Sequence, residues 1–468
     1  MKKLGGQTDP EFLELTRELC AIRSGIVDHG NEDLFRRMGQ EIPLRMFRFP
    51  SGQEHNGWVI PDAWRVKRAT ISKDGLTIYD GTASHLGVAY YSRSFSGSIE
   101  LPELKKHLFS NAEIPDAQMW HCSWLYKPWL HEWGMTPPHR FIEGLQPGIY
   151  DVVLQTEFNT GDMLVADYHI QGEEDATFVF QSHTCHPYMA NDGFAGTAVL
   201  IRLMQYLKTR RNRLSYRLVL GPEHFSTIFY LRDIPQIELD RIVCGVFPEM
   251  IGTGGPLKMG TTFWGDHYLD MALGHVGRFY AKNFERLPFR QTVGNDETVW
   301  EAPGYEIPFA QMNRSARFGF PFAEYHSTLD TPDVINASDL DEAFDVLRRA
   351  VDVIETDRMP KRKFSGLMCL ANPRRDLYRQ RADPSMRETS GGDESEKWGY
   401  LQDCIVRYME GSMSILEIAE RHGLPYFDVL EYLQNWQRKD LIEFRPFSFG
   451  RTTRRTVEPV RLSWIEGH

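Results

Sequence analysis

The sequence predicts an α/β fold: a mixed, mainly parallel sheet with helices on both faces, accompanied by a small β-rich insert and a C-terminal winged helix. Three patterns support this prediction. From residue 148 to about 255, continuous apolar runs alternate with helical segments, which is typical of a parallel sheet covered on both faces. From about 42 to 100 the hydrophobic period is two. From about 398 the chain resembles two short helices followed by a hairpin.

The chain has 468 residues, enough for two or three domains. We divide it into an N-terminal helical part of the core (1–41), a β-rich inserted domain (42–105), the main part of the core (106–370), a linker (371–397) and a winged-helix-like domain (398–468). The linker is assigned from its polar composition and from its Pro and Gly-Gly residues, which interrupt helices and strands.

The N-terminal part of the chain contains both the hydrophobic period of a helix and that of a strand. Residues 11–40 carry apolar side chains at three- and four-residue spacing and predict helix. LRMFRF, WRVKRATI and LTIYDG predict short strands of the insert, and PELKKHLF predicts a short helix. The aromatic stretch that follows contains Trp120, Trp124, Trp129 and Trp133. These side chains either pack in the core or at a domain interface, or form a wall of a substrate pocket.

The main core begins with YDVVLQTEF and DMLVADYHI, which flank Thr160-Gly161 and predict a hairpin. Three buried strands follow at ATFVFQSH, SYRLVLGPEH and RIVCGVFPEM, with helices between them at GTAVLIRLMQYLKTRR and STIFYLRD. LDEAFDVLRRAVDVIE predicts one further amphipathic helix.

The tail predicts a winged helix. Ser414-x-x-Glu417 is typical of a capping box that opens a helix, and LIEFRPF with RTTRRTVEP predicts a hairpin. The second tail helix carries Asp428 and Glu431, whereas helices that read DNA bases need Arg, Lys, Asn or Gln. We therefore expect the tail to mediate protein docking or homo-oligomerisation, and a nucleic-acid partner is disfavoured.

Charge and cysteine usage exclude other classes of protein. The net charge of −11 disfavours general binding to nucleic acid or to a membrane surface. MKKLGGQTDPEF lacks the apolar run of a signal peptide, and no segment approaches the about 18 apolar residues of a membrane span. The six cysteines are scattered, which fits reduced thiols. We expect a cytoplasmic protein without membrane association.

The three central strands end in residues that can bind a metal. The first strand leads into His183, Cys185, His186 and Asp192, the second ends in Glu223 and His224, and the third ends in Glu249. The carboxyl ends of parallel strands meet at one edge of an open sheet, where ligands bind. The turn-rich segment AEYHSTLDTPD adds His326.

Imidazole and carboxylate ligands suit zinc or a similar divalent ion. Zinc lowers the pKa of bound water towards roughly 7, and a nearby carboxylate can take the proton as that water attacks a carbonyl. A single histidine is more often an ordinary core or surface residue. Four such segments in this order, on alternating strands and helices, indicate a site for one or two zinc ions.

Several motifs resemble a known family. The sequence resembles the di-zinc exopeptidases, which are the aminopeptidases related to glutamate carboxypeptidase and the transferrin-receptor ectodomain. The resemblance rests on AND-G-F-AG after the first strand, a Glu after the second, E-M-I-G after the third, and YHSTLDTPD. The sequence is more similar to a bacterial branch of aminopeptidase-like proteins with a β-rich insert and a C-terminal winged helix. That resemblance rests on S-x-x-CHP-x-x-AND, a Pro-Glu pair, GNDE and EYHS, and it covers nearly the whole chain.

The resemblance implies a metallo-exopeptidase of aminopeptidase type and assigns roles to individual residues. It implies Asp192 as a bridge between two metals or as a ligand of one, His186 or alternatively His183 as the first-site histidine, Glu249 as the first-site carboxylate, His326 as a ligand of the second metal and Glu223 as the general base.

Two positions depart from the pattern of these enzymes. They have two consecutive glutamates where this chain has Glu223 and His224, so that His224 either ligates zinc or points away and leaves a single-metal site. Their first-site histidine is followed two residues later by an orienting aspartate, where this chain has Cys185 or Tyr188. Loss of such a carboxylate costs about 10–100-fold in metal affinity or activity.

Other polar residues have two interpretations each. Arg314 either binds a substrate carboxylate in a bidentate fork or is a surface arginine. Asp296 either holds a substrate amine or orients a ligand histidine, or it is a turn residue. We expect Asp330 to cap the next helix and Cys185 to be a packed thiol near the metal.

We predict a zinc-dependent amide-bond hydrolase that acts on a peptide or a small aminoacylated metabolite. The alternative is a non-catalytic protein that has lost its metals and uses the peptidase fold and the winged helix for binding or regulation. A transcription regulator would need the tail to bind DNA, and the acidic second helix argues against this.

Overall fold

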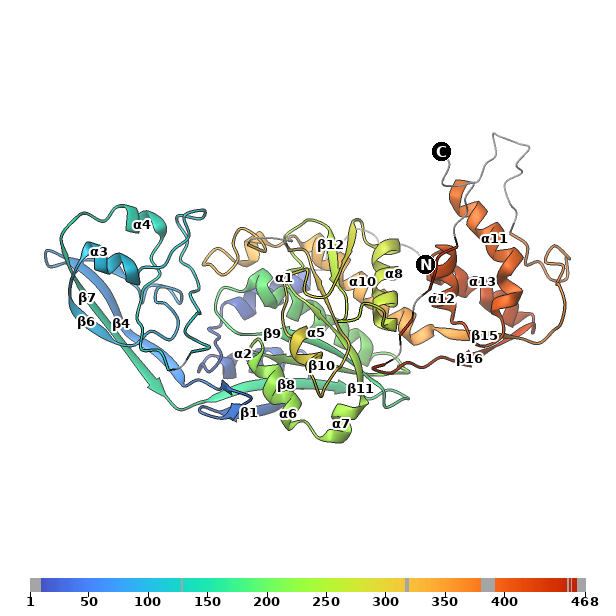
Figure 1. Ribbon diagram of the computed structural model, residues 1–468, viewed down its shortest axis with the longest axis horizontal. Coiled ribbons are helices and arrows are strands. Elements are labelled where there is room, and N and C mark those ends of the chain that lie inside the picture. The colour runs from blue at the N-terminus through green and yellow to red at the C-terminus, as the bar shows by residue number, and fades with distance from the viewer. Residues whose placement is uncertain are drawn as a thin grey trace. The chain divides into compact units, whose positions relative to one another are not determined.

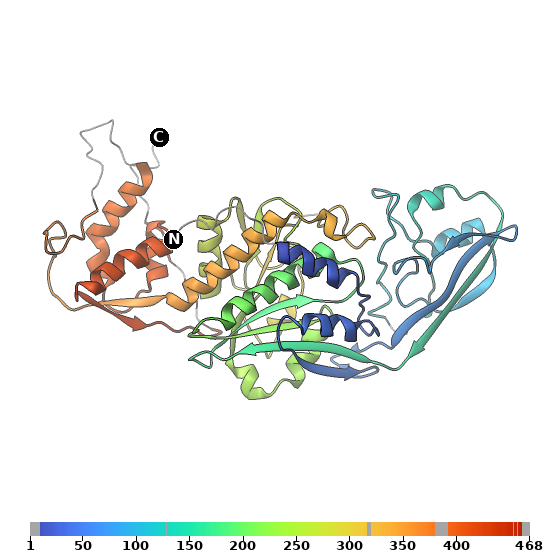
Figure 2. The same cartoon turned by 180° about the vertical axis from the view of Figure 1, so that it is seen from behind.

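The computed structural model describes residues 10–127, 129–315, 320–379, 392–452, 454–455 and 457–460 (Figures 1 and 2). The chain forms two compact units. Unit 1 comprises Met1–Phe263 and Arg286–Phe344, and unit 2 comprises Trp264–Glu285 and Asp345–His468.

The central sheet has eight strands in the order β1-β8-β10-β9-β11-β14-β12-β13. They are β1 (Arg45–Pro50), β8 (Asp162–Ile170), β9 (Thr177–His183), β10 (Ser215–Gly221), β11 (Ile242–Pro248), β12 (Leu257–Gly260), β13 (Phe284–Leu287) and β14 (Phe309–Asn313). Strands β10, β9, β11 and β14 are parallel neighbours, whereas β1, β8 and β12 pair antiparallel. The predicted mixed, mainly parallel sheet is confirmed.

Helices cover both faces of this sheet. Their bounds are α1 (Pro10–Cys20), α2 (Asn31–Met38), α5 (Ala195–Lys208), α6 (Phe225–Asp233), α7 (Gln236–Arg241) and α9 (Glu297–Trp300). Helices α1 and α5 pack together on one face, and α6 and α7 lie on the other (Figures 1 and 2). Every residue of β9, β10 and β11 is therefore buried, which explains their continuous apolar sequences.

The helix predicted over 11–40 is interrupted between α1 and α2. The chain turns back on itself at Gly30, where a Cβ atom would lie 2.0 Å from the carbonyl oxygen of Arg23. This close approach of two backbone segments requires glycine and is incompatible with one continuous helix.

The insert is a four-stranded sheet in the order β5-β4-β7-β6. Its strands are β4 (Ala63–Lys73), β5 (Leu76–Asp80), β6 (Phe95–Glu100) and β7 (Ile149–Asn159), and it is accompanied by β2 (Glu54–His55), β3 (Trp58–Val59), α3 (Leu101–Leu104) and α4 (His139–Glu143). LRMFRF does not belong to it, because β1 pairs with β8 of the central sheet.

The predicted hairpin at Thr160-Gly161 is also wrong. Strand β7 pairs with β4 and β6, whereas β8 pairs with β1 and β10, so the chain passes from one sheet into the other at this point. The burial of the two strands differs accordingly. Strand β7 buries alternate residues near its start, as a strand with one solvated face does, and β8 buries six consecutive residues.

Unit 2 contains α8 (Tyr268–Tyr280), β15 (Arg358–Arg362), α11 (Gly392–Tyr408), α12 (Ile415–His422), α13 (Tyr426–Arg438) and β16 (Ile442–Pro446), while α10 (Ala337–Thr356) continues into it from unit 1. The predicted capping box is present, since the Ser414 hydroxyl accepts from the Glu417 N–H and the Glu417 carboxylate accepts from the Ser414 N–H.

The predicted hairpin of the winged helix has a different partner strand. Strand β16 pairs antiparallel with β15 rather than with RTTRRTVEP, of which Thr453 and Thr456 lie outside the described residues. Helix α11 begins inside the segment assigned as linker, and residues 380–391 of that segment are not described. Helix α8 belongs to the same unit, because the Tyr268 hydroxyl donates to Asp357 at 2.8 Å.

None of the helices in the described ranges is long and apolar enough to cross a membrane.

Candidate metal centre

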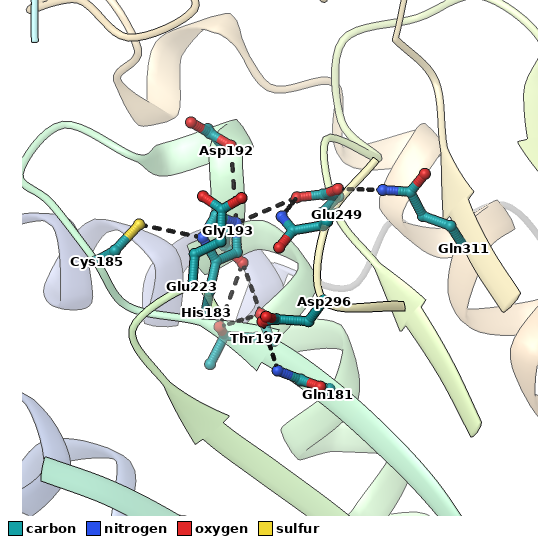
Figure 3. Close-up of polar contacts among 12 residues, drawn as sticks. Gln181, His183, Cys185, Asp192, Gly193, Thr197, Glu223, Glu249, Asp296 and Gln311 are labelled. Carbon is teal, nitrogen blue, oxygen red and sulfur yellow. Dashed lines mark hydrogen bonds and ion pairs between the residues drawn. The ribbon is translucent and has the colours of Figure 1, made fainter. Parts of the chain in front are cut away.

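The ends of β9, β10 and β11 bring three polar side chains to one edge of the central sheet. His183 is the last residue of β9, Glu223 follows β10, and Glu249 follows β11 (Figure 3). The register of the parallel pairing places Gly221 opposite His183. The edge where the sequence predicts a ligand site is therefore the edge where these residues lie.

Glycines of the AND-G-F-AG segment bring Asp192 to the same edge. Asp192 lies in the turn η2 (Ala190–Phe194), where Gly193 has φ +141°, a conformation that other residues rarely adopt. At Gly196, the start of α5 touches the end of β11, because a Cβ there would lie 2.3 Å from the carbonyl oxygen of Pro248. Both glycines allow the close approach that sets Asp192 near Glu249.

Asp192 is shared by two groups of potential ligands. One group is His183, Asp192 and Glu249, and the other is His186, Asp192 and His326. Asp192 Oδ1 lies 3.7 Å from His183 Nε2, and Asp192 Oδ2 lies 3.2 Å from Nε2 of both His186 and His326. His183 Nε2 is also 3.2 Å from Glu249 Oε2. The two carboxylate oxygens thus face different groups, as in a bridging ligand.

The chemistry of the first group fits a bound cation. His183 Nε2 is buried without a hydrogen-bond partner although two carboxylates lie nearby. Burial raises the pKa of Glu249 to about 7, against the opposing effect of His183. A divalent ion would satisfy the nitrogen lone pair and both carboxylates. Nitrogen and oxygen donors of this kind suit zinc.

The second group is enclosed by an aromatic side chain of the stretch after α3. The Trp120 ring stacks on His186 with centroids 3.9 Å apart, and its backbone N–H donates to the His326 carbonyl at 2.7 Å. His186 Nδ1 lies 2.8 Å from the Pro187 carbonyl oxygen, which leaves Nε2 facing Asp192. Of the two interpretations of the tryptophans, Trp120 lines the cluster, whereas Trp129 is 66% exposed.

Glu223 belongs to a third group, with His183 and Cys185. Burial acts to raise the pKa of Glu223, but the hydrogen bond from His224 and the charges of His224 and His183 lower it below its ordinary value. Glu223 is therefore a carboxylate beside the shared cluster, available to accept a proton.

His224 pairs with Glu223 and is in none of the candidate ligand groups of the described residues. Its Nδ1 lies 3.2 Å from Glu223 Oε1, and its ring is parallel to that of Trp58 at 6.0 Å. Burial lowers the pKa of His224, but Glu223 and Asp296 outweigh this and raise it to about 9. Of the alternatives for His224, the geometry corresponds to a side chain directed away from the metal ligands, although the group of His186, Asp192 and His326 still offers a second ion position without it.

Asp296 is a buried acceptor behind the Glu223 segment. Its carboxylate accepts from the His224 backbone N–H at 2.6 Å and from Gln181 Nε2 at 2.7 Å. Burial raises the pKa of Asp296 to about 6. Asp296 therefore holds the backbone that presents Glu223 and His224.

Asp330 and Arg314 have structural contacts that the sequence did not indicate. The Asp330 carboxylate accepts from the N–H groups of Asn191 and Asp192 at 2.8 and 3.1 Å, so it caps the η2 turn rather than the following helix. The buried Arg314 guanidinium donates to the carbonyls of Ile251 and Gly255 and to the Glu342 carboxylate. Arg314 is neither a surface residue nor directed at the ligand cluster, because these buried acceptors occupy its donors.

Four residues that touch the site were missed in the sequence. They are Trp58 on His224, Gln181 on Asp296, and Gln311 and Asn295 on Glu249. Gln181 and Gln311 lie within fully buried strands, and a polar residue in such a strand is a usable signal because its amide needs a partner.

Four of the eleven non-glycine residues with positive φ in the described ranges lie next to the cluster. Tyr188, His224, Met250 and His326 have φ values of +53°, +56°, +49° and +53°. Left-handed conformations are unfavourable for such residues and tend to cluster at functional sites. Here each one redirects the chain next to a candidate ligand or base.

Comparisons with known proteins agree on the fold. A Clostridium acetobutylicum protein, named provisionally for polysaccharide biosynthesis and for an aminopeptidase-like domain, is 25% identical over 429 residues, 90% of this chain and 93% of that protein. A crystal structure of a Clostridium acetobutylicum protein provisionally called a peptidase has a TM-score of 0.76 at 23% identity, covering 93% of this chain and 96% of that one. The zinc aminopeptidase of Bacillus subtilis has a TM-score of 0.55 at 14% identity, covering 75% and 95%.

The central sheet and its helices have the aminopeptidase-like fold of these solved structures. The family described as "Domain of unknown function (DUF4910)" matches residues 13–357, so the chain belongs to this family.

Proposed function

We propose that the protein is a metal-dependent amide-bond hydrolase of aminopeptidase type that uses zinc, with Asp192 shared between two ion positions. The observation that carries this proposal is the pair of ligand groups that meet at Asp192, next to the carboxylate of Glu223. His183 and Glu249 would hold one ion, and His186 and His326 the other. When bound, zinc supplies an electrophile for the carbonyl oxygen and an acidified water.

The residues of the chain perform the proton transfers in this proposal. Glu223 is ionised and takes the proton of the attacking water, then returns it to the leaving amine. His224 holds Glu223 through the contact at 3.2 Å, and Asp296 fixes the backbone of that segment. Trp120 covers the His186 side of the cluster and limits the access of bulk water.

The substrate class follows from this chemistry and from one relative. The provisional name of the Clostridium acetobutylicum relative refers to polysaccharide biosynthesis. We therefore extend the proposed substrates from peptides to small aminoacylated metabolites, including acylated amino sugars.

We also propose that unit 2 serves self-association rather than DNA binding, since α13 carries the half-buried Asp428 and the exposed Glu431 in its first half. Light scattering of the full chain tests this proposal. A strictly monomeric chain that shifts DNA in a salt-dependent manner would contradict it.

The function is tested with Glu223→Gln, which keeps the size of the side chain and removes the base. Aminoacyl anilides, short peptides and N-acylated amino sugars serve as substrates, and metal content is measured on the same samples. We expect the variant to keep its metal and to lose about 10²–10⁴-fold in kcat. Glu157→Gln on β7, outside the site, is the control.

Hydrolysis that persists in Glu223→Gln would refute the assignment of the base. A wild-type protein that binds no zinc and hydrolyses none of these substrates would refute the proposed function and favour a non-catalytic binding protein.

A further inference from the structure

The ring of His183 is contacted at both nitrogens by different chemical groups. Its Nε2 faces Glu249 and Asp192, and its Nδ1 lies 3.2 Å from the sulfur of Cys185 (Figure 3). His183 and Cys185 are each 1% exposed, so water does not replace either contact. The sulfur is thus the partner of the ring nitrogen that faces away from the proposed ion.

We propose that Cys185 is the positioning residue of the His183 subsite: it accepts the Nδ1–H of His183 and thereby leaves the Nε2 lone pair directed at the metal position. This inference rests on the proposed function, since it concerns how one of the two ion positions is prepared.

The position of the proton follows from the contacts of the two nitrogens. Nε2 faces two carboxylates, Glu249 Oε2 at 3.2 Å and Asp192 Oδ1 at 3.7 Å, so it points at the proposed ion position. A proton on Nδ1 has an acceptor in the sulfur of Cys185. Coordination of an ion through Nε2 would therefore need the Nδ1–H tautomer, in which the sulfur accepts the ring proton. In that tautomer Nε2 is the free electron-pair donor.

The local backbone keeps this contact in place. The Thr184 N–H donates to the Gly221 carbonyl at 3.0 Å, which ties the segment between His183 and Cys185 to the end of β10. The backbone on either side of Thr184 is therefore held at the sheet edge, which keeps the Cα atoms of His183 and Cys185 in place.

The two proposed ion positions differ in how their histidines are oriented. His186 Nδ1 lies 2.8 Å from a carbonyl oxygen, that of Pro187, whereas His183 Nδ1 meets a sulfur. Thiol sulfur is a weaker acceptor than a carbonyl or carboxylate oxygen. Because the partner of the outer nitrogen tunes both orientation and basicity of a ligand histidine, we expect unequal affinities, with the His183 position the weaker.

The test is a titration of Co²⁺ into the chelator-treated full chain, followed by calorimetry and by absorption. The variants are Cys185→Ala, which removes the acceptor, and Cys185→Asp, which supplies a stronger one. Cys244→Ala is the matched control, because Cys244 is a fully buried thiol in β11.

We expect two binding steps in the wild type and an affinity about 10–100-fold lower for one step in Cys185→Ala. The other step should keep its affinity, Cys185→Asp should restore the lost affinity, and Cys244→Ala should resemble the wild type. None of the samples should show a sulfur-to-cobalt charge-transfer band, because the sulfur contacts the ring and not the ion.

Two results would overturn the inference while leaving the proposed function intact. One is Co²⁺ binding that is unchanged in Cys185→Ala. The other is a sulfur-to-cobalt band that disappears in this variant, which would make Cys185 a direct ligand in the group with His183 and Glu223. A wild-type chain that binds no Co²⁺ would instead overturn the proposed function, and the inference with it.

Discussion

Replacing Asp192 by Asn should remove both ions, whereas replacing any other ligand should remove one. Asp192 is the only residue common to the His183–Glu249 and His186–His326 groups among the described residues. Asparagine keeps the shape of the side chain but offers one neutral oxygen in place of two charged ones. It can therefore serve neither group as the present carboxylate does.

The size of the effect can be estimated from binding linkage. A ligand present at about 100 times its Kd stabilises the folded state by about 2.7 kcal/mol, so two ions contribute about 5 kcal/mol. For domains of 150–250 residues, 1 kcal/mol changes the Tm by about 2–4 °C. Unit 1, with 322 residues, is longer than these domains, so the lower value of about 2 °C per kcal/mol applies, and zinc should raise its Tm by roughly 10 °C in the wild type. The rise should be about half as large in Glu249→Gln and in His326→Gln, and close to zero in Asp192→Asn.

The assay is calorimetric unfolding of chelator-treated protein with and without zinc, together with the metal content of each sample. The metal-free Tm of each variant is its own reference, so that a change in the stability of the metal-free protein does not enter. Retention of either ion, or of a zinc-dependent rise in Tm, by Asp192→Asn would refute the idea that this carboxylate is shared.

Three further predictions concern residues around the ligands and in unit 2. Trp58→Ala should lower kcat by up to about tenfold with unchanged metal content, since an aromatic contact such as that with His224 is worth about 0.5–1.5 kcal/mol; equal kcat would exclude this role for Trp58. Arg314→Met should cost about 3 kcal/mol or more in urea unfolding because it removes the buried ion pair with Glu342 and the hydrogen bonds to the Ile251 and Gly255 carbonyls, and a normal stability with an altered KM would instead indicate substrate binding. Burial raises the pKa of Asp357 from 3.8 to about 6, so its contribution to stability is complete below pH 3.8 and is lost as the pH rises through about 6. Relative to the wild type, Asp357→Asn should gain roughly 3 kcal/mol in unfolding free energy between pH 4 and pH 7, and a constant difference would contradict this.

Sequence patterns were sufficient where a property depends on neighbours along the chain. Three buried apolar runs separated by helices require a parallel sheet, and such a sheet brings its carboxyl ends to one edge. His183, Glu223 and Glu249 therefore had to lie near one another once the strands were recognised. The capping box at Ser414 could also be predicted from the sequence, because its two hydrogen bonds join residues only three positions apart.

The sheet to which each strand belongs was harder to predict, because it depends on partner strands that are distant in the sequence. Strands β7 and β8 are adjacent in sequence and both have strand-like periods, yet each pairs with segments of a different sheet. The same holds for β16, whose partner β15 lies about 80 residues earlier in the chain. No local pattern distinguishes these pairings from a hairpin.

The division of the ligands into two groups was decided by the tertiary structure alone. His183 and His186 are three residues apart and chemically identical, and the sequence left open which of them serves which position. The left-handed turn at Tyr188 and the Trp120 ring direct His186 towards His326, while the end of β9 directs His183 towards Glu249. Residue type and spacing determined that a metal could bind at this edge. Which atoms would hold the metal was determined by the direction of the side chains. That direction depends on turns and on contacts with residues more than 60 positions away in the chain.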